Sequence, residues 1–270
     1  MSLCIYHGNC ADGFGAAWVV RKALGETEFH PGKYQEPPPD VTGKDVVMVD
    51  FSYKRPVLLE MAEKANSILI LDHHKTAAED LLDLPANVTA KFDMDRSGAM
   101  LTWEHFFPGE APPPLLLHIE DRDLWRFALQ NTRQIQANVF SFPYDFQAWD
   151  TLMAAAPAAL AAEGEAIERK HFKDIRELLG VTTREMVIGG HRVPVANLPY
   201  TMSSDAGHEM AKGRPFAACY WDTPEGRVFS LRSNDEGVDV SEVAKQYGGG
   251  GHRNASGFKV SFAAAVAFEV

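Results

Sequence analysis

The sequence predicts an α/β fold with two domains: a larger N-terminal domain built on a mainly parallel sheet and a smaller C-terminal α/β domain. The first observation behind this is three short apolar runs, residues 3–6, 46–49 and 67–71. Such runs are consistent with strands buried on both faces of a parallel sheet, although periodicity alone does not exclude buried helices. The second is that helix-like stretches alternate with these runs, which implies βαβ units.

The helix-like stretches of the first half separate the expected strands. Residues 16–24 follow the first strand, and residues 57–65 lie between the second and the third. Another helix is expected over residues 97–103, with Ser97 as its N-cap. A proline run at residues 37–39 stops any helix there.

The third observation is a long polar helix pattern at residues 157–179, with Gly180 as its expected stop. We interpret this helix as the connector between the two domains. The predicted division is residues 1–156 for the N-terminal domain, 157–181 for the connecting helix and 182–270 for the C-terminal domain.

The expected C-terminal domain contains a second, smaller sheet. Residues 192–196, 215–221 and 228–233 are typical of its strands. Glu225-Gly226 is expected to turn the last two into a hairpin.

Composition limits the classes of function. The chain has 270 residues, and its formal net charge of -11 argues against tight, sequence-independent binding to long nucleic acid. Small phosphorylated substrates are still allowed, because a metal centre and a few arginines can reverse the sign of the charge locally. The three cysteines are widely spaced and suggest neither a disulfide framework nor a zinc ribbon. No apolar run reaches the ~18 residues of a spanning helix, so we expect a soluble, cytoplasmic protein.

Polar side chains follow each of the three apolar runs. Asp72-His73-His74 ends the third run, His7 ends the first with Asp12 shortly after, and Asp50 ends the second. Buried carboxylates and imidazoles are costly in a core but natural around a divalent metal. Because the carboxyl ends of parallel strands share one edge, we expect these residues to converge there.

A fourth candidate is the acidic cluster that contains Asp121 and Asp123. The alternative interpretation of this cluster is a helix turn whose charges face water. The cluster is a candidate source of metal ligands only because the three strand ends before it already carry side chains of the types that bind metals.

The glycine run at residues 248–251, followed by His252, is the second strong feature. Successive exposed backbone N–H groups can bind an anion, and glycine allows a ligand to approach closely. The alternative is a flexible surface loop. Arg232 is a candidate phosphate ligand, since a guanidinium matches phosphate oxygens, or else an ordinary surface arginine.

Taken together and in this order, these motifs resemble the DHH/DHHA1 phosphoesterase superfamily, which includes RecJ-like and oligoribonuclease-like phosphohydrolases. The resemblance spans nearly the whole chain. It implies an N-terminal DHH domain with a divalent metal centre, usually manganese, and a C-terminal DHHA1 domain that closes over it and holds the substrate. The chain departs from the family pattern at Phe14, where many members place a second aspartate.

Under this resemblance, our hypothesis assigns two ions, Mn²⁺ or alternatively Mg²⁺, to the centre. His7, Asp12 and Asp50 bind one, and Asp50, His73 and Asp121 bind the other, with Asp121 preferred to Asp123. Asp72 orients a neighbouring imidazole, and His74 contacts the substrate phosphate or assists the leaving oxygen. The distal phosphate or nucleoside is held by Arg232, Gly250, Gly251 and His252.

The expected function is hydrolysis of phosphoester bonds in small nucleotides or short oligonucleotides by metal-activated water. The alternatives are a pyrophosphatase or polyphosphatase on the same centre, and a nucleotide-binding module that lost catalysis with the carboxylate missing at Phe14. The expected partner is a small phosphorylated substrate, with neither long duplex nucleic acid nor a membrane. A second copy of the chain is a further candidate partner.

Overall fold

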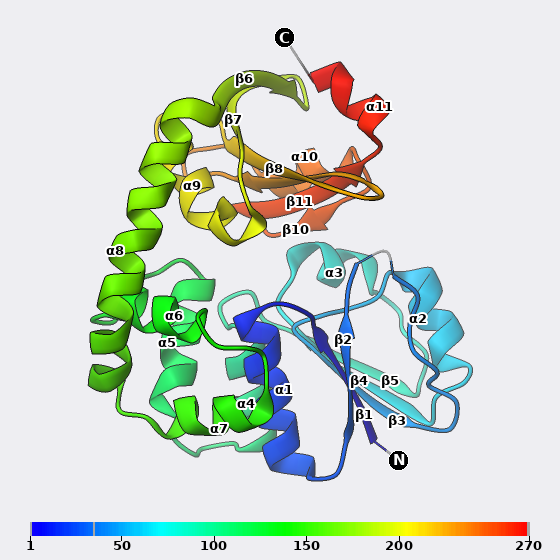
Figure 1. The fold of residues 1–270 in the computed structure, drawn as a ribbon. Coiled ribbons are helices and arrows are strands. Elements are labelled where there is room, and N and C mark those ends of the chain that lie inside the picture. Colours follow the sequence, from blue (N-terminus) through cyan, green and yellow to red (C-terminus); the bar gives the residue numbers. More distant parts are fainter. Residues whose placement is uncertain (1, 35, 269–270) are drawn as a thin grey trace. The chain divides into compact units, whose positions relative to one another are not determined.

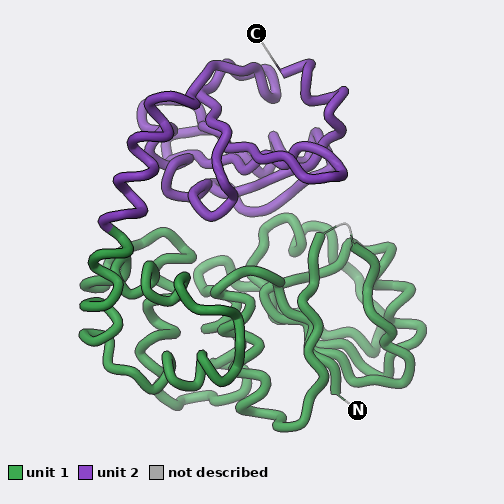
Figure 2. Tube along the Cα trace, viewed as in Figure 1, with its two compact units in different colours: residues 1–168 green, residues 169–270 purple. Residues whose placement is uncertain are grey.

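The computed structural model describes residues 2–34 and 36–268. The chain forms two compact units, residues 1–168 and residues 169–270 (Figure 2). Each unit contains its own sheet, so the molecule is the two-domain α/β protein that the sequence predicts. The division falls after Glu168, inside the long helix α8 (Pro157–Thr182) that the sequence suggested as a separate connector.

Unit 1, residues 1–168, is built on a five-stranded sheet in the order β2-β1-β3-β4-β5, in which every pairing is parallel. The three predicted strands are confirmed as its centre. Two edge strands were not predicted. The strands are β1 (Ser2–His7), β2 (Glu28–Gly32), β3 (Asp45–Val49), β4 (Ser67–Asp72) and β5 (Val88–Phe92).

Helices cover both faces of this sheet (Figure 1). Cys4 and Val47 face a core formed with α1 and α4, while Leu3 and Val46 face a second core formed with α2. Burial on both sides is the reason that the central strands are continuous apolar runs. The helices are α1 (Ala11–Leu24), α2 (Arg55–Ala62), α3 (Lys75–Asp80), α4 (Gly98–Phe106), α5 (Pro114–Asp123), α6 (Thr132–Val139) and α7 (Phe146–Ala154).

Unit 2, residues 169–270, contains a six-stranded mixed sheet in the order β10-β11-β9-β8-β7-β6. Only the β7–β8 pair is parallel among the described strands of this second sheet, and β8 and β9 form the predicted hairpin. The strands are β6 (Thr183–Ile188), β7 (His191–Asn197), β8 (Ala217–Thr223), β9 (Gly226–Arg232), β10 (Gly250–Gly251) and β11 (Ala255–Val260).

The helices of unit 2 are short apart from α8, which runs on to Thr182, so the predicted stop at Gly180 is wrong by two residues. None of the described helices is both long and apolar enough to cross a membrane. The short helices are η1 (Tyr200–Met202), α9 (Ser203–Met210), α10 (Val240–Lys245), α11 (Phe262–Ala265) and η2 (Val266–Phe268).

Candidate metal centre

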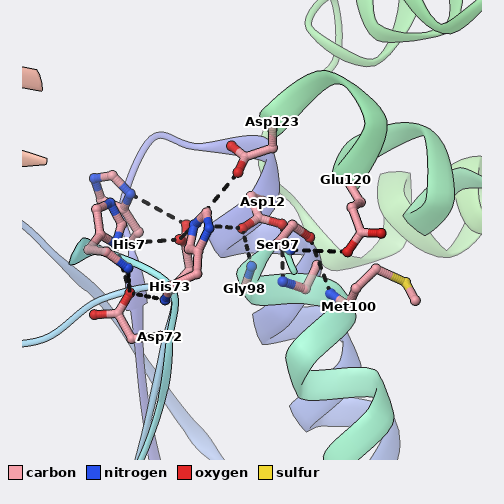
Figure 3. A network of polar contacts seen from close by, with 12 residues as sticks. His7, Asp12, Asp72, His73, Ser97, Gly98, Met100, Glu120 and Asp123 are labelled. Atoms are coloured by element: carbon pink, nitrogen blue, oxygen red, sulfur yellow. Dashed lines mark hydrogen bonds and ion pairs between the residues drawn. The ribbon is translucent and has the colours of Figure 1, made fainter. Parts of the chain in front are cut away.

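Side chains from three strand ends and two helices meet at the carboxyl edge of the unit 1 sheet (Figure 3). His7 ends β1, Asp50 follows β3, and Asp72 ends β4 with His73 and His74 directly after it. Asp12 comes from the first turn of α1, and Asp123 is the last residue of α5. The parallel topology therefore gathers residues that lie far apart in the sequence.

The imidazole of His73 lies among three carboxylates. Its Nε2 is 3.0 Å from Asp50 Oδ1, 3.6 Å from Asp12 Oδ2 and 3.6 Å from Asp123 Oδ2. His73, Asp12 and Asp50 are each at most 2% exposed. One ligand atom from each of these three lies within 4.8 Å of the other two, which is close enough to hold one cation.

A second group with the same property contains His7, Asp50 and His74. His7 Nδ1 lies 3.4 Å from Asp50 Oδ2, the other oxygen of the carboxylate that contacts His73. Asp50 is thus common to both groups. The two groups differ from the predicted ligand sets, because Asp12 lies with His73 and not with His7.

Asp72 holds the loop that carries the two histidines. Its Oδ1 accepts hydrogen bonds from the backbone N–H of His73 and of His74, at 2.7 and 3.2 Å, and lies 2.7 Å from His74 Nδ1. Its Oδ2 accepts from the Ser52 hydroxyl. When Nδ1 of His74 donates to Asp72, the lone pair of the ring is on Nε2, which is the form of imidazole that binds metal ions.

Asp12 joins the centre to the N-terminus of α4. Its carboxylate accepts hydrogen bonds from the backbone N–H of Gly98 and of Ala99, at 2.6 and 3.0 Å (Figure 3). These N–H groups have no partner inside a helix, so a carboxylate there is stabilised. The centre is therefore anchored by secondary structure on both sides of His73.

Asp50 sits in a tightly defined position. Its backbone is left-handed, with φ 53°, which is uncommon for a residue with a side chain. A Cβ added at Gly98 would lie 2.4 Å from the Asp50 Cβ, so only glycine fits there. Residues held in such conformations are often part of functional sites.

The buried charges shift each other's pKa. Burial opposes the negative charge of Asp50, but the close contacts with His7 and His73 and the positive charge of these imidazoles outweigh it and hold the Asp50 pKa well below its usual range. Burial also lowers the His73 pKa, yet the contacts with Asp50 and the charges of Asp123 and Asp12 raise it well above normal. The Asp12 pKa is raised well above normal by burial and then by the charges of Asp50 and Asp123. The centre therefore has an excess of negative charge.

Two observations indicate that these residues fit a divalent cation. First, Asp50 Oδ2 is buried and, apart from the ion pair with His7 Nδ1 at 3.4 Å, has no hydrogen-bond partner among the described residues, although burying a carboxylate oxygen without one is costly. Second, carboxylate oxygen and imidazole nitrogen are donors that suit manganese and other first-row divalent metals. A cation would compensate the negative charge of the crowded carboxylates and would be bound by Asp50 Oδ2.

The structure brings the carboxylate of Asp123, and not that of Asp121, close to His73. The two residues lie about 200° apart around α5, so they face different directions. Asp123 Oδ2 approaches His73, whereas the Asp121 carboxylate accepts from the backbone N–H of Ala128 and of Leu129 and from the Thr132 hydroxyl. The preference for Asp121 rested on spacing along the sequence, which does not determine the direction in which a helical side chain points.

Phe14 is a core residue and occupies no ligand position. It is 2% exposed, and its ring packs against Phe146 and Trp149 at centroid distances of 4.8 and 5.0 Å. The described structure brings three carboxylates to His73 without a second aspartate at position 14.

The predicted substrate-binding residues lie in unit 2. Arg232 donates to the hydroxyls of Ser230 and Ser204, at 3.0 and 2.8 Å, so its guanidinium has a fixed orientation. Gly250 and Gly251 form β10 and pair with β11. His252, directly after β10, donates its backbone N–H to the Ala255 carbonyl.

Backbone packing explains part of the glycine run. A Cβ at Gly249 would lie 2.1 Å from the Gly257 carbonyl oxygen, and one at Gly251 would lie 2.6 Å from that of Ala255. The run is therefore a defined turn and not a flexible loop. The anion-binding role of these residues is still a prediction.

No protein-family model matches the chain. Among solved structures it is similar to an uncharacterized protein from Helicobacter pylori, with 16% identity, a TM-score of 0.45 and coverage of 96% of this chain and 93% of that one. It is also similar to PggH, a pGpG-specific phosphodiesterase from Vibrio cholerae, with 14% identity, a TM-score of 0.49 and coverage of 98% and 95%. A third similar structure is an exopolyphosphatase-related protein from Bacteroides fragilis, with 14% identity, a TM-score of 0.44 and coverage of 96% of this chain and 86% of that one. At these scores the likenesses carry no argument about function.

A sequence relative is much more similar. Uncharacterized protein R106 of Acanthamoeba polyphaga mimivirus is 31% identical over 287 aligned positions, which cover 97% of this chain and 68% of the relative. Identity at this level over nearly the whole chain shows common descent. The chain therefore belongs to the protein family that includes R106 of this mimivirus.

Proposed function

We propose that the chain is a DHH-type, divalent-metal-dependent phosphohydrolase that cleaves phosphoester bonds of small nucleotides or short oligonucleotides. The observation that carries this proposal is that one buried carboxylate, Asp50, belongs to both candidate ligand groups, with one oxygen 3.0 Å from His73 and the other 3.4 Å from His7. A carboxylate shared between two groups is the arrangement expected of a two-metal hydrolytic site.

In this proposal Asp12, His73 and Asp123 hold one cation, His7 and His74 hold the other, and Asp50 contacts both. Bound cations of this kind activate a water molecule and stabilise negative charge on the phosphoryl group. The protein's own contribution is to fix the ligands before substrate arrives.

Asp72 is the positioning residue of the proposed centre. Its contacts with His74 Nδ1 and with the loop backbone fix the imidazole in one orientation. Burial opposes ionisation of Asp72, but the charge and hydrogen bond of His74 lower its pKa to about 2. It therefore stays ionised as an acceptor at neutral pH, which favours Nε2 of His74 as the atom that faces a cation or the phosphate.

In unit 2, Arg232, Gly250, Gly251 and His252 are proposed to hold the distal phosphate or nucleoside of the substrate. The fixed guanidinium of Arg232 supports this role, since a preoriented fork loses less entropy when it binds phosphate oxygens.

The test is a substrate panel with manganese: short RNA, linear and cyclic dinucleotides, 3′-phosphoadenosine 5′-phosphate, pyrophosphate and polyphosphate. We expect turnover of a phosphodiester, lost on chelation and reduced by at least about 100-fold in Asp50→Asn. The control is Asp222→Asn, the same exchange at a surface ion pair with Arg227. Turnover of pyrophosphate or polyphosphate alone contradicts the proposed substrate class. Wild-type rates in Asp50→Asn contradict the proposed centre.

A further inference from the structure

Next to the candidate centre, two arginines and three aromatic rings form a surface that we call the arginine–aromatic patch: Arg122, Trp125, Phe127, Arg133 and Phe140. The guanidinium carbon of Arg133 lies 3.7 Å from the Phe127 ring centre and 5.6 Å from that of Trp125. That of Arg122 lies 5.5 Å from Trp125 and 4.8 Å from Phe140. The patch is thus a continuous series of alternating cations and rings.

The loop that carries Trp125 and Phe127 is built in detail. Both residues have left-handed backbones, with φ 56° and 47°. The backbone N–H of Phe127 donates to the Asp121 carbonyl, and the Asp121 carboxylate accepts from two N–H groups further along the loop. Strained positions that are held by this many contacts concentrate at functional sites. Asp121 therefore holds the loop in the conformation that positions the rings of Trp125 and Phe127.

The patch adjoins the centre along the chain. Asp123, whose carboxylate approaches His73, is two residues before Trp125. Their Cα atoms are therefore at most about 7.6 Å apart, a separation that a single nucleotide can bridge. A chain threaded past the centre would meet the patch with its adjacent nucleotide.

The patch also has the positive charge and the solvent exposure that binding of a nucleotide requires. The protein carries a net charge of -11, yet the patch holds two guanidiniums, those of Arg122 and Arg133. Phe140 is 46% exposed, and Trp125 and Phe127 are half-buried. Aromatic and guanidinium planes stack on nucleobases, and the guanidinium charge attracts phosphate. Inorganic polyphosphate has no ring that could use such planes.

We propose that the arginine–aromatic patch is a stacking subsite for the nucleobase next to the scissile phosphodiester, so that the preferred substrate is a single-stranded oligonucleotide. This inference rests on the proposed phosphohydrolase function and narrows its substrate class. The rings and guanidiniums stack on the base, and their positive charge draws the adjoining phosphate toward the centre.

The experiment compares binding and turnover in Arg133→Gln, Arg122→Gln and Trp125→Leu. Binding of a fluorescein-labelled pentanucleotide is measured by anisotropy in EDTA, so that no hydrolysis occurs. Turnover with manganese is measured on the pentanucleotide and on glycerophosphoglycerol, a small phosphodiester that has no aromatic ring to stack on the patch. We expect Kd for the pentanucleotide to rise roughly tenfold in each variant. We also expect kcat/KM for the pentanucleotide to fall roughly tenfold further than kcat/KM for the small diester.

The matched control is Arg21→Gln, because Arg21 also lies over an aromatic ring, Phe146, at 4.9 Å. It is nine residues along α1 from Asp12, or about 13 Å, and its variant should leave both measurements unchanged. Pentanucleotide Kd values equal to wild type in both glutamine variants overturn the subsite, as does an equal loss on both substrates. A wild type that binds through the patch but hydrolyses neither substrate overturns the phosphohydrolase proposal instead.

Discussion

At the scale of single residues, position within an element decides the role of each acidic side chain. Asp50, Asp72 and Asp123 lie at the ends of their strands or helix and face the centre, whereas Asp121 is in the same helix as Asp123 but faces the following loop. Residue type alone does not separate these roles. The direction in which each side chain points separates these roles, because an α-helix turns by about 100° per residue.

This difference predicts opposite effects for two identical substitutions in α5. Asp123→Asn should lower manganese-dependent kcat/KM by about 100-fold and change the free energy of unfolding by at most about 0.5 kcal/mol, since its side chain is 25% exposed. Asp121→Asn weakens charge-assisted hydrogen bonds to two backbone N–H groups and Thr132, and should cost about 1–2 kcal/mol of stability. Urea denaturation and steady-state kinetics measure both.

Each variant is the control for the other. If Asp121→Asn removed activity at unchanged stability while Asp123→Asn remained active, the ligand assignment would have to be reversed.

The candidate site was predictable from sequence as far as the strand ends. His7, Asp50 and Asp72 follow apolar runs, and parallel strands bring their carboxyl ends to one edge. That Asp123, and not Asp121, has its carboxylate near His73 was not predictable, because it depends on how α5 is rotated against the sheet. The partner of each histidine was not predictable either, since it is set by the turn after each strand.

At the scale of elements, the central strands and most long helices were predictable because their burial leaves a clear pattern. The edge strands β2 and β5 were missed. β2 contains Pro31 and exposed Glu28, and β5 alternates buried and exposed positions over only five residues. Edge strands are solvated on one side, so they lack the continuous apolar run that identifies the centre of the sheet.

Helix α8 offers a matched pair of glycines for a test of packing. A Cβ at Gly164 would lie 1.8 Å from the Gln134 carbonyl oxygen of α6, whereas one at Gly180 would meet nothing within 4 Å. Gly164→Ala must push α8 away from α6 and should cost about 2 kcal/mol or more of stability. Gly180→Ala, in the last turn of α8, should gain at most about 0.5 kcal/mol. Chemical denaturation followed by circular dichroism measures both, and equal effects would show that α8 does not pack on α6 as closely as described.

At the scale of the whole molecule, the order of apolar runs and helix patterns predicted two α/β domains, and the net charge argued against a surface for long nucleic acid. It did not predict how negative charge is distributed. Several carboxylates are gathered and buried at one edge of unit 1, while arginines and rings gather beside them. Such local arrangement comes from the fold and is invisible in a net charge of -11.

Metal binding should therefore stabilise the folded protein measurably. Free manganese at about 100 times its Kd adds about 2.7 kcal/mol to the stability of the state that binds it. We expect manganese to raise the Tm of the wild type by several degrees, EDTA to reverse the increase, and Asp50→Asn to show no increase. An equal rise in both proteins would indicate binding elsewhere on this acidic chain.

The close packing of Asp50 against Gly98 limits which substitutions this protein can accept during evolution. The backbone of Asp50 is left-handed and its Cβ lies against Gly98, so a side chain at position 98 would displace Asp50 from its place in the centre. The Asp123 side chain, in contrast, is 25% exposed and is not among the nearest contacts of that position. We expect descendants of this sequence to retune their ion preference through the outer carboxylate, while the middle one stays invariant.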